Sequence, residues 1–66
     1  MQGQVKKLMA DRGFGFIRSS EGEEVFFHRS AVVDGSFEFL REGQAVDFEI
    51  ENSPRGPRAR DVKVLG

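Results

Sequence analysis

Residues 46–51 form the most regular stretch of the chain, because apolar and polar side chains alternate there without a break (Val46-Asp47-Phe48-Glu49-Ile50-Glu51). Successive side chains of a strand point to opposite faces, so the pattern predicts a half-buried β-strand with Val46, Phe48 and Ile50 directed inward. Four further segments are expected to be strands, at residues 2–9, 14–18, 24–28 and 59–65.

The connections between these segments are short, and none predicts a long helix. In the longest connection, residues 29–42, Ser30 is placed to cap a single helical turn that Asp34-Gly35 would end. Residues 52–57 have the composition of a loop. Five short strands predict a sandwich or a barrel, and closure removes the exposed edges of an open sheet. We therefore expect an all-β, five-stranded antiparallel barrel in which residues 1–66 form a single domain.

Composition excludes several classes of function. The chain has no cysteine and one histidine, His28, so neither a metal site nor a catalytic triad with oriented partners is predicted. We expect no enzyme activity, no cofactor and no small-molecule substrate. The first residues contain no apolar stretch typical of a signal peptide, and no segment reaches membrane-spanning length, which predicts a cytoplasmic protein without membrane contact.

Aromatic side chains are the main candidates for a binding surface. The chain holds 7 phenylalanines without Trp or Tyr, more rings than a core of this size readily encloses. If Ile17, Val25 and Phe27 point into the barrel, one outward cluster remains on the two neighbouring strands: Phe14, Phe16, Phe26 and His28. The opposite assignment would bury these rings, and the alternation alone leaves both assignments open.

An outward aromatic cluster would bind single-stranded RNA or DNA, since bases stack on such rings with little dependence on sequence. The net charge of −1 means that stacking must supply much of the affinity. Basic side chains at the rim are expected to contact phosphates. The candidates are Lys7, Arg12 and Arg55, followed by Lys6, Arg29 and Arg58.

Two motifs make the chain resemble the bacterial cold-shock protein family. Arg12-Gly13-Phe14-Gly15-Phe16-Ile17 is similar to the family's first ribonucleoprotein-type motif, and Val25-Phe26-Phe27-His28 is similar to its second. The likeness extends over the whole chain. It implies an oligonucleotide-binding (OB) barrel, a stacking surface that includes Phe37 besides the four residues above, and the role of an RNA chaperone. We also expect the chain to be a monomer.

Departures from the family pattern affect this expected surface. The family usually has Trp-Phe where we align Leu8-Met9, so these two residues are expected to offer apolar contact without the tryptophan ring. Arg29 replaces a common Phe and is able to stack on a base as a guanidinium. Phe39 is either an additional ring or an anchor of its loop. The alternative function is a protein-interaction module with weakened nucleic-acid binding.

Overall fold

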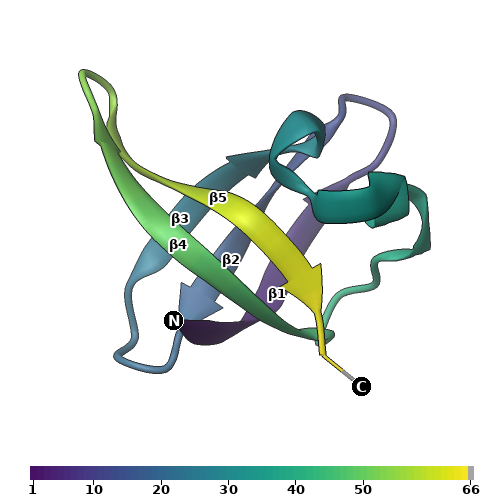
Figure 1. The fold of residues 1–66 in the computed structure, drawn as a ribbon, viewed down its shortest axis with the longest axis horizontal. Coiled ribbons are helices and arrows are strands. Elements are labelled where there is room, and N and C mark those ends of the chain that lie inside the picture. Colours follow the sequence, from purple (N-terminus) through teal and green to yellow (C-terminus); the bar gives the residue numbers. More distant parts are fainter. Residues whose placement is uncertain (66) are drawn as a thin grey trace.

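The computed structural model describes residues 1–65, without the side chains of residues 34–36. The chain forms five strands: β1 (Gln2–Met9), β2 (Phe14–Ser19), β3 (Glu24–His28), β4 (Ala45–Ser53) and β5 (Gly56–Val64). Two short 3₁₀ segments, η1 (Arg29–Ala31) and η2 (Val33–Phe39), connect β3 to β4. Figure 1 shows them beside the strands, on the side where β1 ends.

The strands close into a barrel in the order β1-β2-β3-β5-β4. Each ladder is antiparallel except the contact that closes the barrel, where Phe26 of β3 and Arg58 of β5 pair in parallel. The expected five-stranded barrel is therefore confirmed. Closure pairs β3 with β5, which begins 28 positions after the last residue of β3. Every strand therefore has two neighbours.

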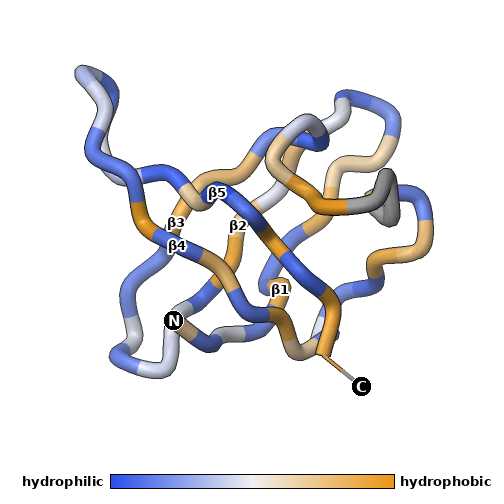
Figure 2. Tube along the Cα trace, in the orientation of Figure 1, coloured by the Kyte–Doolittle hydropathy of each residue, from blue (hydrophilic) through white to orange (hydrophobic). Residues whose placement is uncertain are grey.

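The inward side chains of all five strands fill the barrel. Along β5, apolar positions are separated by one or two polar ones (Figure 2), and its buried residues are Ala59 and Val62. Val46 and Phe48 of β4 are buried, and Ile50 packs against the same core, as the alternation predicted. The fully enclosed core comprises Val5, Ile17, Val25, Phe27, Val46, Phe48 and Val62.

The connection between β3 and β4 differs from the sequence prediction. A 3₁₀ helix continues through Asp34-Gly35 to Phe39, because Val32, Phe37 and Leu40 bury their side chains against the barrel and hold the segment in place. Packing thus overrides the expected stop at Asp34-Gly35. No helix among residues 1–65 is long and apolar enough to cross a membrane.

The connection between β4 and β5 is shorter than the predicted loop. The two strands remain paired up to Ser53 and Gly56, so only Pro54 and Arg55 lie in the turn. The Ser53 hydroxyl donates a hydrogen bond to the Gly56 carbonyl across this turn. The resulting hairpin extends beyond the barrel wall (Figure 1).

Gly15 sits where β2 passes closest to its neighbours. A Cβ atom at this position would lie 2.6 Å from the Lys7 carbonyl oxygen and 2.9 Å from Cε1 of Phe27. Both distances are below normal contact, so only glycine fits without displacing β1 or the core. The residue thereby allows β2 to present Phe14 and Phe16 on the outer surface of a tightly packed wall.

Candidate nucleic-acid interface

Four aromatic side chains lie together on the outer surface of β2 and β3. Phe14 is opposite His28, and Phe16 is opposite Phe26, in the antiparallel register. The three phenyl centroids are 5.6 Å (Phe14–Phe26), 6.0 Å (Phe16–Phe26) and 6.3 Å (Phe14–Phe16) apart. We call these four residues the aromatic platform. The rings meet edge-on or tilted, and Phe14 and Phe16 are half-buried whereas Phe26 is exposed.

The inner surface of the same two strands carries the complementary set. Ile17, Val25 and Phe27 have no exposed surface, whereas the ring of Phe26 is 37% exposed. Of the two assignments that the sequence left open, the structure has the one with the platform outside. The reason is packing: the inward set fills the barrel, and exchanging it would place His28 in the core.

His28 is held in a defined orientation by the segment that follows it. The Ser30 backbone N–H donates to Nδ1 of His28 at 3.1 Å, and the Ser30 hydroxyl lies 2.9 Å from the same atom. An Nδ1 that accepts this bond carries no proton, so the N–H of the neutral ring is on Nε2. His28 therefore caps η1, and the prediction that Ser30 caps this turn is wrong.

Strand β1 extends the outer surface with two of the expected residues, Lys7 and Met9, but not with Leu8. Lys7 lies opposite Phe16 and Met9 opposite Phe14, whereas Leu8 lies opposite Gly15 and packs against the core. Leu8 is therefore half-buried against the core and does not share the face of Phe14 and Phe16. The cause is a bulge between Val5 and Lys7 that shifts the side-chain alternation by one residue.

The bulge also changes which residue takes the platform position of β1. Lys7, and not Leu8, shares the face of Phe16, so an aromatic ring placed at Leu8 would point into the barrel. The sequence contains one sign of this irregularity. Lys6 and Lys7 are consecutive polar residues between the apolar Val5 and Leu8, which breaks a strict alternation.

Phe37 is not part of the platform surface, contrary to expectation. Its side chain is 6% exposed, and its ring packs edge-on against Phe27 with 6.1 Å between centroids. The exposed ring of this segment is Phe39, at 78%. Phe39 therefore does not anchor the segment, and Phe37 does so instead.

Carboxylates neutralise two of the candidate cations. Lys6 donates to Glu24, and Nε of Arg58 lies 2.6 Å from Oε2 of Glu51. Among the side chains that the structure describes, no carboxylate forms an ion pair with four other candidates: Lys7, Arg12, Arg29 and Arg55. These four are the side chains with charge available for a phosphate.

The Lys6 contact lowers the pKa of its partner, Glu24. The hydrogen bond from Lys6, and then the charge of Lys6, hold the pKa of Glu24 below its ordinary value, with a smaller contribution from the Arg18 charge. Glu24 is thus more firmly ionised than an isolated glutamate. Lys6 is correspondingly less free to contact a ligand than Lys7 beside it.

Arg29 lies directly over the turn that precedes β2. Its backbone N–H donates to the Gly13 carbonyl at 2.8 Å. Its Cδ is 3.2 Å from the point that a Cβ on Gly13 would occupy, and Gly13 has a positive φ of 77°. The guanidinium stem is therefore supported by the backbone next to Phe14, at the end of the platform.

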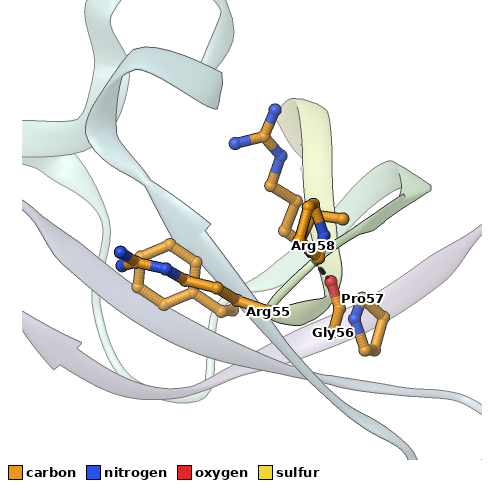
Figure 3. A pocket seen from close by; sticks show the side chains of 7 residues that line it. Arg55, Gly56, Pro57 and Arg58 are labelled. Atoms are coloured by element: carbon orange, nitrogen blue, oxygen red, sulfur yellow. Dashed lines mark hydrogen bonds between the residues drawn. The ribbon is translucent and has the colours of Figure 1, made fainter.

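A hollow of about 550 Å³ adjoins the platform at the β4–β5 hairpin. Phe26 forms one wall, and the remaining lining comes from residues 53–58. Figure 3 shows the Arg55 and Arg58 side chains leaving the hairpin in different directions. The sequence pattern predicts a role for both arginines, but not for Pro57, because its place in the lining depends on the β4–β5 register.

Comparison with known proteins identifies the same architecture and sequence pattern. A family model described as "'Cold-shock' DNA-binding domain" matches residues 1–65. The chain is 47% identical to "Cold shock-like protein CspC" of Bacillus cereus over 65 residues, covering 98% of this chain and 100% of that protein. It is 46% identical to a "Cold shock-like protein" of Thermotoga maritima, covering 98% of each.

One solved structure extends the comparison to the fold. The chain superposes on "drosophila Unr CSD456" with a TM-score of 0.81 and 32% sequence identity, covering 98% of this chain. It spans 26% of that longer chain, so the likeness concerns one domain of it. Together with the barrel topology and the platform, the whole-length matches determine the family. The chain belongs to the cold-shock domain family.

Proposed function

We propose that this chain binds single-stranded RNA or DNA by stacking bases on the aromatic platform, with low sequence specificity and without catalysis. The observation that carries the proposal is a group of three phenyl rings on the outer surface, one exposed and two half-buried, with centroids within 6.3 Å of one another. Exposed aromatic groups of this kind usually mark a binding surface. Each base stacked on such a ring contributes about 1–3 kcal/mol.

The cations without carboxylate partners surround this surface and provide the phosphate contacts in our proposal. Lys7 is beside Phe16, Arg29 is next to Phe14, and Arg55 lies at the hairpin next to Phe26. Arg12, in the turn before β2, belongs to the same group. A single strand would thus have its bases on the rings and its phosphates at the rim.

The biological role that we propose is that of an RNA chaperone acting as a cytoplasmic monomer, with residues 1–66 as one binding domain. Binding the unpaired form of an RNA shifts its folding equilibrium by mass action, without energy input. This would keep messages translatable or influence transcription termination. The family model's description, "'Cold-shock' DNA-binding domain", supports the nucleic-acid binding on which this role depends.

Titration of a thymine hexanucleotide against wild type and Phe26→Ala tests the proposal. Loss of one stack weakens binding by about 1–3 kcal/mol, roughly a five- to more than a hundredfold rise in Kd. Val64→Ala is a matched control, because Val64 is 38% exposed and lies on β5 opposite Val46, six residues beyond the partner of Phe26. Circular dichroism establishes that each variant is folded under the binding conditions.

The salt dependence of binding separates the proposal from the protein-interaction alternative. Contacts to phosphates release counterions, so affinity for a single strand must fall as salt rises. An apolar protein interface would change little. Equal binding by wild type and Phe26→Ala, or no binding of any single strand at low salt, would remove the basis of the proposed function.

A further inference from the structure

On the β5 and β4 side of the platform, charges occur in opposed pairs. Arg58 is the register partner of Phe26, and Glu51 of β4 lies opposite Arg58 with an Nε–Oε2 distance of 2.6 Å. Arg60 lies opposite Glu49 in the same ladder. This side of the platform is therefore close to electrically neutral, in contrast to the β1 side at Lys7.

A second hollow, of about 220 Å³, lies where the platform meets this charged ladder. Phe26 and His28 line it on one side, and Glu51, Arg58 and Arg60 line it on the other. Neighbouring strands are about 4.8 Å apart. A base stacked on Phe26 would therefore direct an edge over β5, where the Glu51–Arg58 pair meets it.

The pair is better suited to a base edge than to a phosphate. A phosphate that contacts Arg58 would also approach the Glu51 carboxylate, and the two anions would repel each other. A base edge offers both donors and acceptors, and here the carboxylate only accepts while the guanidinium only donates. The pair therefore presents one fixed acceptor next to one fixed donor group.

Guanine satisfies this arrangement with the largest number of contacts. Its N1–H and 2-amino group are adjacent donors for the carboxylate, and its O6 accepts from a guanidinium, which is a common partner of guanine. Uracil and thymine offer one ring N–H as donor. Adenine and cytosine offer one amino group.

We propose that Glu51 and Arg58 read the edge of the base stacked on Phe26 and that this position favours guanine. The proposal rests on the proposed function, because it requires a stacked base. It assigns to Arg58 a role in base recognition instead of the phosphate contact expected from the sequence. Hydrogen bonds to a base edge discriminate less between bases when they are open to solvent, and this pair is partly exposed. We therefore expect a Kd for guanine at this position about fivefold lower than for thymine.

The test uses thymine hexanucleotides in which one position at a time is guanine or inosine, since inosine lacks only the 2-amino group. Wild type is expected to bind one guanine-containing strand about fivefold more tightly than the all-thymine strand, with inosine between them. Glu51→Gln is expected to abolish the difference. Glu49→Gln is the matched control, because Glu49 is on the same strand and lines a different hollow.

Salt dependence distinguishes base recognition from a phosphate contact at Arg58. A phosphate contact in a single strand contributes about 0.7 to the slope of log K against log salt. Lys7→Gln is expected to reduce the slope by about 0.7, and Arg58→Gln is expected to leave it unchanged. Both variants retain the barrel, since the two side chains are exposed.

Two outcomes would overturn the inference. One is equal affinity of wild type for all strands. The other is tighter binding of every strand by Glu51→Gln with a slope steeper by about 0.7, which would make Glu51 a competitor for a phosphate site. Either result leaves the proposed function intact as long as the all-thymine strand binds, whereas absence of all binding contradicts the proposed function itself.

Discussion

Replacing Phe37 by alanine is expected to destabilise the domain severely, whereas the same change at Phe39, two residues later, is expected to have almost no effect. Phe37 is 6% exposed and packs on Phe27, and Phe39 is 78% exposed. Removing a buried phenylalanine costs about 3–5 kcal/mol, because burial and contacts are lost and a cavity remains. A domain of this length has a total unfolding free energy of roughly 3–10 kcal/mol. Phe37→Ala therefore removes a large part of the stability.

Urea unfolding followed by far-ultraviolet circular dichroism measures this effect, since the chain has no Trp or Tyr for fluorescence. Phe39→Ala should remain within about 0.5 kcal/mol of wild type. If Phe37→Ala is unfolded without urea, Phe37→Leu gives a measurable intermediate loss, because it retains apolar volume but loses the ring pair with Phe27. An unchanged urea midpoint for Phe37→Ala would contradict a core position of Phe37. Reduced affinity of that stable variant for a thymine hexanucleotide would instead place Phe37 in the stacking surface.

Two further predictions concern the wall that carries the platform. Gly15→Ala should destabilise the barrel by about 1–3 kcal/mol, because the added Cβ would lie 2.6 Å from the Lys7 carbonyl oxygen. An unchanged urea midpoint would contradict this close approach of β1 to β2. Lys6→Gln should raise the pKa of Glu24 toward its ordinary value, which NMR titration of the carboxyl group measures. Equal Glu24 pKa values in the variant and wild type would show that the Lys6 contact is absent in solution. The pKa of Glu24 is lower in the folded protein than in the unfolded chain. The ionised Glu24 therefore stabilises the fold at pH values above its ordinary pKa, and this stabilisation is lost as the pH falls through the folded-state pKa.

Much of the fold follows from local sequence patterns. The alternation over residues 46–51 predicted β4 and its inward side chains, and the segments at 2–9 and 24–28 coincide with β1 and β3. These predictions hold because a side chain's face in a regular strand depends only on its position in the alternation. The candidate site could be predicted to the same extent: Phe14 and Phe16 share a face wherever β2 is regular.

Where the strands are irregular, the local pattern was insufficient. Counting by twos from Val5 would place Lys7 inside, and only the bulge in the β1–β2 pairing puts Lys7 on the platform and Leu8 against the core. Phe37 and Phe39 are equivalent in sequence terms, both being aromatic residues in one connection. Their separation into a core residue and an exposed one depends on the position of Phe27 across the barrel.

Local sequence patterns account for the number of strands, for the alternation that builds the core, and for the motifs that carry the family resemblance. The tertiary structure decided which face of β2 and β3 is outside, since both faces are apolar and only filling the closed barrel with Ile17, Val25 and Phe27 distinguishes them. It also decided which cations keep their charge available. Arg58 and Glu51 are seven residues apart in the chain, and their neutral pair exists only because the β4–β5 register places them opposite each other.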